Sequence, residues 1–278
     1  MIKINDVFIK RVRREPVPRK LVLYLYPAYR YLFYAFVVID TLVLGIIAIV
    51  LSFFDSSGNI GCNLGKLWSR INLFLSGVRV SVKGLDNLDP NQSYIVMSNH
   101  QSYYDVFAIM ASLPLQMRWV MKSELRKIPF FGFACERIGT ISIDRGESAK
   151  ARQTLNAAIE KIKAGASIVI FPEGTRSTDN NLLPFKKGGF VLAIASAVPI
   201  LPVSVRGGKD IMPKGAGLKM RPGFMEVVVH KPVSTREYSL ETKEQLMERV
   251  RDIIQSGVID VGEGQGDKKA TANKPSPW

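Results

Sequence analysis

A histidine and an aspartate five positions apart are the residues of this chain best placed to do chemistry. His100 and Asp105 lie between a run typical of a buried strand, residues 94–97, and a helical pattern, residues 106–110. In α/β proteins, ligands bind at the carboxyl ends of strands. With His100 on the turn and Asp105 in the first helical turn, the carboxylate can accept a hydrogen bond from one ring nitrogen. The other nitrogen is then free as a base, which is the arrangement that activates a hydroxyl group for attack.

The same residues have a structural interpretation. Ser102 and Asp105 are spaced as a capping box, in which a serine caps the helix and an acidic residue three positions later bonds back to it. The two interpretations stay open as alternatives. Replacing Asp105 separates them, because a cap supports stability alone and an orienting carboxylate supports chemistry.

The composition favours an anionic partner. Lys and Arg number 38 against 24 Asp and Glu, which leaves a net charge of +14. Such an excess suits nucleic acid, anionic lipid or phosphorylated substrates. Nucleic-acid binding is disfavoured, because the basic residues gather ahead of a long apolar run and are not interleaved with aromatic residues on one element. Cys62 and Cys135 fit neither a metal-ligand spacing nor a disulfide framework.

Residues 1–60 are predicted to hold the protein at a membrane. Basic residues precede an apolar run, 21–54, in which only Arg30 and Asp40 are charged. Residues 31–54 are long enough to span a bilayer. A mid-segment aspartate argues against a span, and several tyrosines resemble an interfacial belt. A spanning helix and a re-entrant or in-plane anchor therefore remain equal alternatives. The basic residues predict a cytoplasmic N-terminus, and we expect a membrane-associated protein whose active site lies on the cytoplasmic side.

The rest of the chain predicts a single α/β domain. An amphipathic helix is expected at 61–77, the domain itself at 78–260, and a disordered tail at 261–278, where Gly, Lys, Asn, Pro and Ser dominate. Strands alternating with helices predict one mixed, mostly parallel sheet covered by helices on both faces. Strands are expected at 78–82, 94–97, 117–122, 140–145, 167–171, 201–205 and 225–230, and further helices at 129–137, 148–164, 188–197 and 240–255.

Four blocks resemble the motifs of the glycerolipid acyltransferase family, in that family's order. The first two are Asn-His-Gln-Ser-Tyr-Tyr-Asp at 99–105 and Gly-Thr-Ile-Ser-Ile-Asp-Arg at 139–145. The third is Phe-Pro-Glu-Gly-Thr-Arg-Ser at 171–177, and the fourth is Val-Pro-Ile-Leu-Pro-Val at 198–203. A single block is weak evidence, whereas four in order are strong. The resemblance spans about residues 78–235, so the predicted anchor rests on composition alone.

The resemblance implies an enzyme that acylates 1-acylglycerol-3-phosphate, the acceptor of the members that fit best. It implies transfer from an acyl thioester of coenzyme A or acyl carrier protein, with phosphatidic acid as the product. It further implies that His100 is the general base, that Asp105 orients it, and that the second and third blocks hold the acceptor. No metal or cofactor beyond the thioester donor is expected. The expected partners are the lipid acceptor, the donor and the membrane.

The phosphate of such an acceptor needs cations and backbone amides. Arg176 follows a predicted buried strand and can fork onto phosphate oxygens, while Gly174 permits a tight turn. Arg145 and Lys122 end other predicted strands. The structural alternatives are a Glu173–Arg176 ion pair and a salt bridge between Arg145 and its neighbouring aspartate. The predicted substrate-binding residues are Glu173, Gly174, Thr175, Arg176, Arg145 and Lys122.

Other functions and another chemical route stay open. Glycerol-3-phosphate or another lysophospholipid can be the acceptor, since the motif residues barely separate these substrates. A non-catalytic lipid-binding protein of the same fold is disfavoured, because such a module has no use for a base and its orienter. The sequence holds no Gly-x-Ser-x-Gly elbow, which favours direct attack by the acceptor. Ser98 and Ser102 keep an acyl-enzyme route open.

Overall fold

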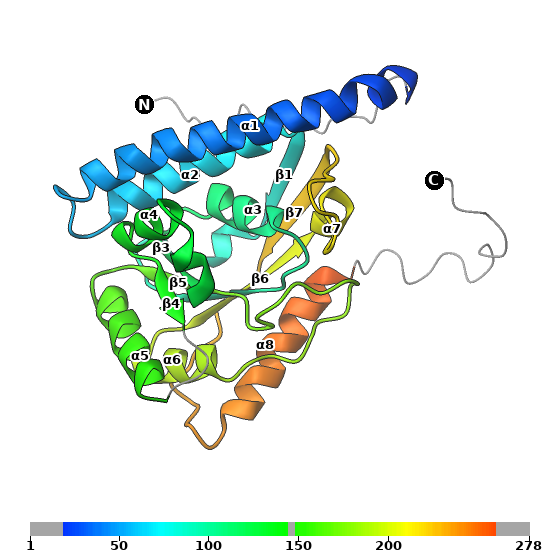
Figure 1. The fold of residues 1–278 in the computed structure, drawn as a ribbon. Helices are drawn as coiled ribbons and strands as arrows, with labels where there is room; N and C mark the ends of the chain where they lie inside the picture. Colours follow the sequence, from blue (N-terminus) through cyan, green and yellow to red (C-terminus); the bar gives the residue numbers. More distant parts are fainter. Residues whose placement is uncertain (1–18, 144–147, 260–278) are drawn as a thin grey trace, which may run out of the picture.

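A seven-stranded sheet forms the centre of the computed structural model, which describes residues 19–143 and 148–259 (Figure 1). The strand order is β1-β7-β6-β2-β5-β3-β4. The pair β6–β7 is antiparallel and the other neighbouring pairs are parallel, which confirms the predicted mixed, mostly parallel sheet. The strands are β1 (Val78–Lys83), β2 (Ile95–Ser98), β3 (Met117–Lys122), β4 (Ile141–Ile143), β5 (Ser167–Ile170), β6 (Ile200–Arg206) and β7 (Gly223–Val229).

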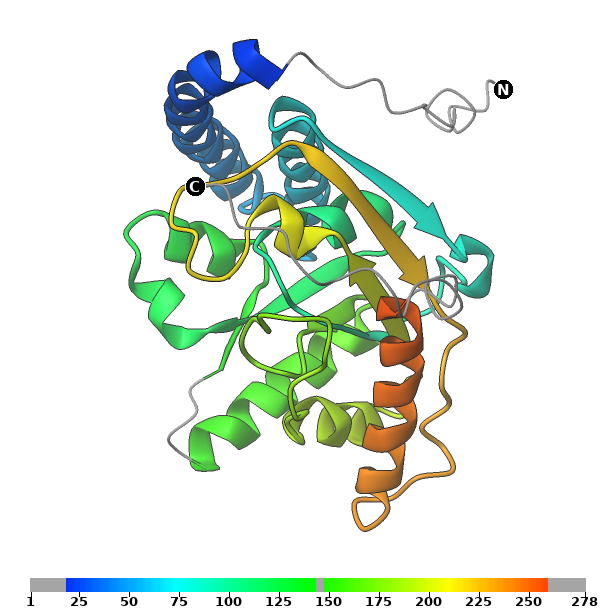
Figure 2. The ribbon, with the colours of Figure 1, turned by 90° about the vertical axis from the view of Figure 1, so that its right-hand side faces the viewer.

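Helices cover both faces of this sheet (Figures 1 and 2). Tyr94 and Val96 belong to the core on one face, while Ile95 and Met97 belong to the core on the other. Successive strand side chains point to opposite faces, so the run from Tyr94 to Met97 is apolar throughout because it is buried on both faces. The first face carries α2 (Asn59–Leu75), α3 (Tyr104–Ser112) and α7 (Gly208–Ile211), and the second carries α5 (Ser148–Lys163), α6 (Gly188–Ser196) and α8 (Lys243–Val258).

The long helix α1 (Arg19–Leu51) lies along the domain, against α2 and the short helix α4 (Phe131–Arg137) (Figure 1). Polar contacts fix its inner side. Asn72 Nδ2 donates to Asp40 Oδ2 over 2.8 Å, and Trp68 Nε1 donates to Thr41 Oγ1 over 3.1 Å. Asp40 is buried between the two helices. Asp40, the acidic residue in the middle of the apolar run, therefore faces the protein.

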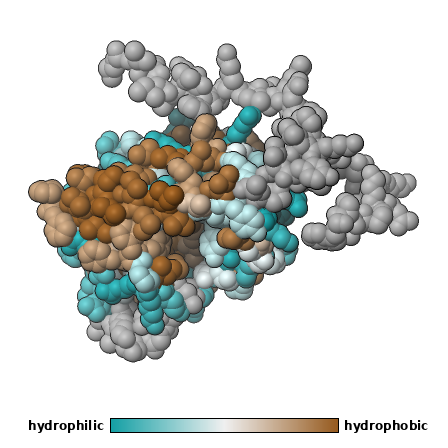
Figure 3. Space-filling view, turned by 45° about the horizontal axis from the view of Figure 1, so that its top comes forward, coloured by the Kyte–Doolittle hydropathy of each residue, from teal (hydrophilic) through white to brown (hydrophobic). Residues whose placement is uncertain are grey.

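The outer side of α1 is apolar and exposed. The segment Tyr29–Leu51 is long and apolar enough to cross a membrane, and only 11% of its most apolar window is buried. Figure 3 shows the apolar surface as a broad patch. Its residues recur at spacings of three and four, which places them on one stripe of the helix. This stripe consists of Leu32, Phe36, Ile39, Val43, Ile46 and Val50.

The structure shifts a few predicted boundaries. Helix α3 begins at Tyr104 with Tyr103 as its N-cap residue, one position later than the capping-box spacing indicates. The predicted strand at 140–145 is observed as β4, and residues 144–147 lie outside the described part. The basic head, 1–18, and the predicted disordered tail, from residue 260 on, also lie outside it.

Candidate active site

The carboxyl end of β2 brings His100 and Asp105 together. His100 follows β2 by two residues, and Asp105 lies in the first turn of α3. His100 Nδ1 and Asp105 Oδ2 are 3.0 Å apart, and the Asp105 side chain is only 1% exposed. His100 Nε2 has no hydrogen-bond partner among the described residues, and the His100 side chain is 15% exposed. The contact expected from the spacing is present, with one ring nitrogen held and the other available.

Asp105 also fastens the backbone that precedes the helix. Its Oδ2 accepts hydrogen bonds from the N–H groups of Gln101 and Ser102, over 2.6 and 2.7 Å. In return, Ser102 Oγ accepts from the Tyr104 N–H over 3.3 Å. The bond from the Ser102 N–H to Asp105 is one half of a capping box, whereas the Ser102 hydroxyl accepts from Tyr104 and not from the Asp105 N–H that the other half requires. The structural and the orienting interpretations of Asp105 therefore hold at once, through a single oxygen.

Phe171 fixes the plane of the His100 ring. The two rings are stacked, with centroids 3.9 Å apart and an interplanar angle of 10°. Met97 of β2 pairs with Ile170 of β5, so the residues just beyond both strands meet. Asp105 fixes the rotation of the imidazole and Phe171 fixes its tilt. No local sequence pattern predicts this support, although Phe171 opens the third block.

Glu173 supports the His100 loop from the other side. It is 2% exposed, and its two oxygens accept the N–H groups of His100 and Leu183, each over 2.9 Å. Ser177 N–H donates to the His100 carbonyl over 2.7 Å. Burial raises the pKa of Glu173, and the two backbone N–H bonds oppose that rise. The geometry gives Glu173 a supporting role, and among the described residues no ion pair joins it to Arg176. Its contact with the acceptor stays a prediction.

The turn after β5 presents Arg176 beside this loop. Gly174 has φ of +69°, the left-handed conformation that glycine tolerates without strain. The Arg176 guanidinium lies over the Tyr103 ring, 3.9 Å from its centroid. Lys214 Nζ donates to the Arg176 carbonyl over 2.9 Å and lies 3.4 Å from Oγ1 of the exposed Thr175. The sequence offered a weak signal for Tyr103, an aromatic residue inside the first block, and none for Lys214.

The other two predicted cations are only partly described. Lys122 ends β3, where its backbone pairs with Ile143 of β4, and its side chain lies outside the described part. Arg145 lies wholly outside it. Since β3 and β4 run parallel to β2 and β5, their carboxyl ends lie at the same edge of the sheet as His100. Their binding roles stay predictions.

The two serines of the alternative chemical route are buried. Ser98 and Ser102 are both 0% exposed. Ser98 Oγ donates to the Asn99 carbonyl over 3.1 Å, and Ser102 Oγ donates to the Met212 carbonyl over 2.9 Å. A nucleophilic hydroxyl needs contact with a base and access for the substrate. The geometry of these serines therefore disfavours an acyl-enzyme.

Comparisons with known proteins define the class of this domain. Residues 79–206 match the family model described as "Acyltransferase". The crystal structure of the 1-acyl-sn-glycerophosphate acyltransferase PlsC from Thermotoga maritima superposes with a TM-score of 0.73 and 28% identity. That match covers 90% of this chain and 100% of the other. The fold is that of an α/β acyltransferase.

Curated relatives agree with this class. The human 1-acyl-sn-glycerol-3-phosphate acyltransferase alpha is 33% identical over 198 residues, which is 70% of each chain. The chloroplastic enzyme BAT2 of Brassica napus is 34% identical over 171 residues, 61% of this chain and 49% of that protein. The chain thus spans about half the length of its chloroplastic relatives. It belongs to the glycerolipid acyltransferase family, as its four sequence blocks predicted.

The hydrogen bonds of the two histidines predict opposite ring tautomers. Asp105 can only accept, so neutral His100 carries its proton on Nδ1. Ser204 Oγ donates to the Ile254 carbonyl and lies 2.8 Å from His230 Nε2, so neutral His230 carries its proton on Nε2. Nitrogen-15 NMR of histidine-labelled protein in detergent above pH 8 should resolve one signal set of each type. A His100→Ala variant assigns them, and an Nε2–H tautomer at His100 would contradict the orienting role of Asp105.

Proposed function

We propose that this protein transfers an acyl chain from an acyl thioester to the free hydroxyl of 1-acylglycerol-3-phosphate, giving phosphatidic acid. The observation that carries the proposal is the His100–Asp105 pair, with Nδ1 bonded to a buried carboxylate and Nε2 available. The names of the human and chloroplastic relatives support the choice of acceptor.

His100 is the general base of the proposed reaction. Its Nε2 takes the proton of the acceptor hydroxyl while the hydroxyl oxygen attacks the thioester carbonyl. Asp105 holds the proton on Nδ1 and stabilises the imidazolium that forms. Collapse of the tetrahedral intermediate breaks the carbon–sulfur bond, and His100 returns the proton to the leaving thiolate. The acyl chain passes directly to the acceptor, in keeping with the buried Ser98 and Ser102.

Arg176 is proposed to bind the acceptor phosphate. The Arg176 guanidinium stacks on the Tyr103 ring. Because Tyr103 follows His100 by three residues, this contact holds the guanidinium beside the loop that carries His100. A planar guanidinium can donate two parallel hydrogen bonds to phosphate oxygens. Arg145 and Lys122 are proposed as further cations, since Lys122 ends β3 and Arg145 follows the last residue of β4 by two positions in the sequence. The thioester of coenzyme A or acyl carrier protein is the co-substrate, and the reaction needs no other cofactor.

Helix α1 is proposed to anchor the domain in the plane of the membrane. Its inner side packs on α2 and α4, and the buried Asp40 bonds to Asn72. A spanning α1 would draw these polar contacts into the bilayer, which favours the in-plane alternative. The exposed stripe of α1 then faces the acyl chains, which is where an acyl-bearing acceptor resides. The basic residues ahead of α1 favour the cytoplasmic side.

Loss of the base should abolish turnover while the fold persists. His100→Ala is expected to lower kcat by about 10²–10⁴-fold, the usual contribution of a general base. Phosphatidate formation from radiolabelled thioester and lysophosphatidate measures it, with circular dichroism and vesicle binding as folding controls. Asp105→Asn should lower both kcat and stability, because this one side chain also fastens Gln101 and Ser102. Near-normal turnover of His100→Ala would refute the mechanism.

Replacing Arg176 by lysine should not be conservative. Lysine keeps the charge but loses both the fork and the planar stack on Tyr103. A lost charge-assisted contact costs roughly 1.5–3 kcal/mol, or about ten- to over a hundred-fold in kcat/KM for the acceptor. The donor KM should change far less. The proposal is contradicted if the variant loses kcat/KM equally for donor and acceptor and still prefers a phosphorylated acceptor. The phosphate would then bind at another site.

Charges on the exposed stripe of α1 should release the protein from membranes. Ile39→Glu and Val43→Glu put carboxylates on residues that are 59% and 50% exposed, without touching the inner contacts of the helix. The fraction bound in a vesicle flotation assay should fall strongly for the double variant. Leu240→Glu, which alters a 49% exposed leucine outside the stripe, is the matched control. Equal binding of the double variant and the control would exclude α1 as the anchor.

A further inference from the structure

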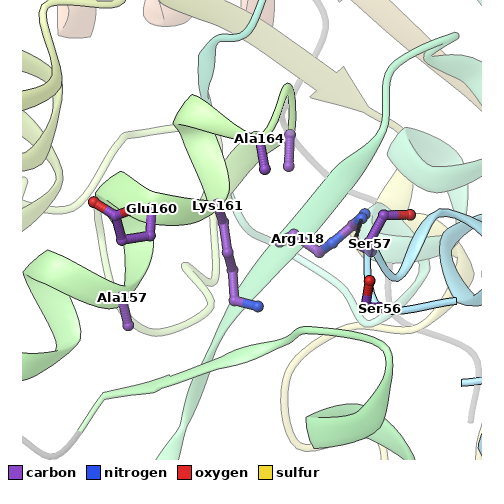
Figure 4. A pocket seen from close by; sticks show the side chains of 8 residues that line it. Ser56, Ser57, Arg118, Ala157, Glu160, Lys161 and Ala164 are labelled. Carbon is purple, nitrogen blue, oxygen red and sulfur yellow. Dashed lines mark hydrogen bonds between the residues drawn. The ribbon is translucent and has the colours of Figure 1, made fainter. Parts of the chain in front are cut away.

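A cavity of about 290 Å³ lies among the loop between α1 and α2, the start of β3 and the end of α5 (Figure 4). Its volume is near the low end of the range for small-ligand sites. The polar groups around it are Ser56 and Ser57 of the loop, Arg118 of β3 and Lys161 of α5. Small side chains leave the space open, namely Ala157 of α5 and Ala164 and Ala166 just after that helix. Glu160 is the acidic residue of its wall.

This cavity is separate from the proposed active site. Arg118 is the second residue of β3 and pairs with Ile168 near the start of β5, whereas His100 follows the end of β2. Strands β2, β5 and β3 are parallel. The cavity therefore lies at the amino edge of these strands, and His100 lies at their carboxyl edge.

Two cations are held close together beside it. Arg118 is 2% exposed and is fixed by bonds from Nη2 to the Ser57 carbonyl over 2.6 Å and to Asn59 Oδ1 over 2.8 Å. A Cβ on Gly139 would lie 3.0 Å from Arg118 Nε and 3.2 Å from Lys161 Nζ. Both nitrogens therefore lie close to one point beside Gly139, which makes the two cationic groups near neighbours.

The local acidic groups offset this positive charge only in part. Asp55, in the same loop as Ser56 and Ser57, acts on Arg118 through its charge, but no ion pair joins the two among the described residues. Glu160 pairs with Lys163 Nζ over 2.9 Å, and Figure 4 shows its carboxylate directed away from Arg118 and Lys161. Among the described residues, no carboxylate lies within ion-pair distance of Lys161. Burial, and to a smaller extent the charge of Arg118, lower the pKa of Lys161. A bound anion would relieve this repulsion in a setting where water screens it poorly.

We infer that this cavity binds a phosphate group, with Lys161 and Arg118 as its cations and the Ser56 hydroxyl as a further donor. A phosphate monoester presents the oxygens that a fixed guanidinium and an ammonium recognise. Its source is either a soluble phosphate or a lipid headgroup. The second source is within reach because the same loop carries Phe53 and Phe54, which are 70% and 83% exposed.

Lysine footprinting on the full-length protein in neutral detergent tests this inference. Acetylation of Lys161 is followed by mass spectrometry while inorganic phosphate is added, with sodium chloride at matched ionic strength as the reference. Lys163, two residues along the same helix and exposed, is the internal control. A second arm replaces phosphate with micelles containing phosphatidate, against micelles containing phosphatidylcholine.

Saturable, severalfold protection of Lys161 with unchanged Lys163 supports the site. Protection by inorganic phosphate assigns a soluble ligand, and protection by phosphatidate micelles alone assigns a headgroup. The inference is overturned if neither probe protects Lys161. It is equally overturned if Lys163 is protected in parallel, or if chloride or phosphatidylcholine protects Lys161 as well. Both readouts are independent of turnover, so they stand apart from the proposed acyl transfer.

Discussion

One buried carboxylate oxygen holds the proposed active site together. Asp105 Oδ2 accepts the His100 ring N–H and the backbone N–H groups of Gln101 and Ser102. Burying a carboxylate that is 1% exposed is costly unless such donors replace the water it loses. The same oxygen therefore fastens the turn before α3 and orients the histidine ring. Gly208 of α7 closes the other side, since a Cβ there would collide with Asp105 Oδ1.

The third sequence block, residues 171–177, also uses a buried carboxylate to fix the backbone, at the end of the neighbouring strand β5. Glu173, also buried, ties the backbone of His100 to that of Leu183, and Phe171 stacks on the imidazole. Arg176 stacks on Tyr103 in the same way. These contacts, made across the β2–β5 pair, hold Glu173, Phe171 and Arg176 in place beside the His100 loop. Prior fixation of reacting groups lowers the entropy that a reaction must lose. In the proposed reaction, buried residues such as Glu173 would contribute in this way, by holding His100 in place.

Local patterns were enough to predict the seven strands, the longer helices and the His100–Asp105 contact, but not the short helix α7. Strand β3 occupies the predicted residues 117–122, and His100 meets Asp105 within one turn of chain. Local patterns could not predict the hydrogen bond from the His100 N–H to Glu173 or the stack of Arg176 on Tyr103. They join segments about seventy residues apart, and only the adjacency of β2 and β5, absent from either segment alone, brings them together. Asp40 shows the same limit, since its partner Asn72 lies on another helix.

The central claim is that His100 Nε2 receives the proton of the acceptor hydroxyl. A crystal structure with 1-acylglycerol-3-phosphate and a non-reactive thioether analogue of the donor tests it most directly. The account predicts the free hydroxyl about 2.6–3.2 Å from Nε2, the phosphate on the Arg176 guanidinium and the Asp105 contact unchanged. A hydroxyl bound away from Nε2, with the phosphate remote from Arg176, would contradict it.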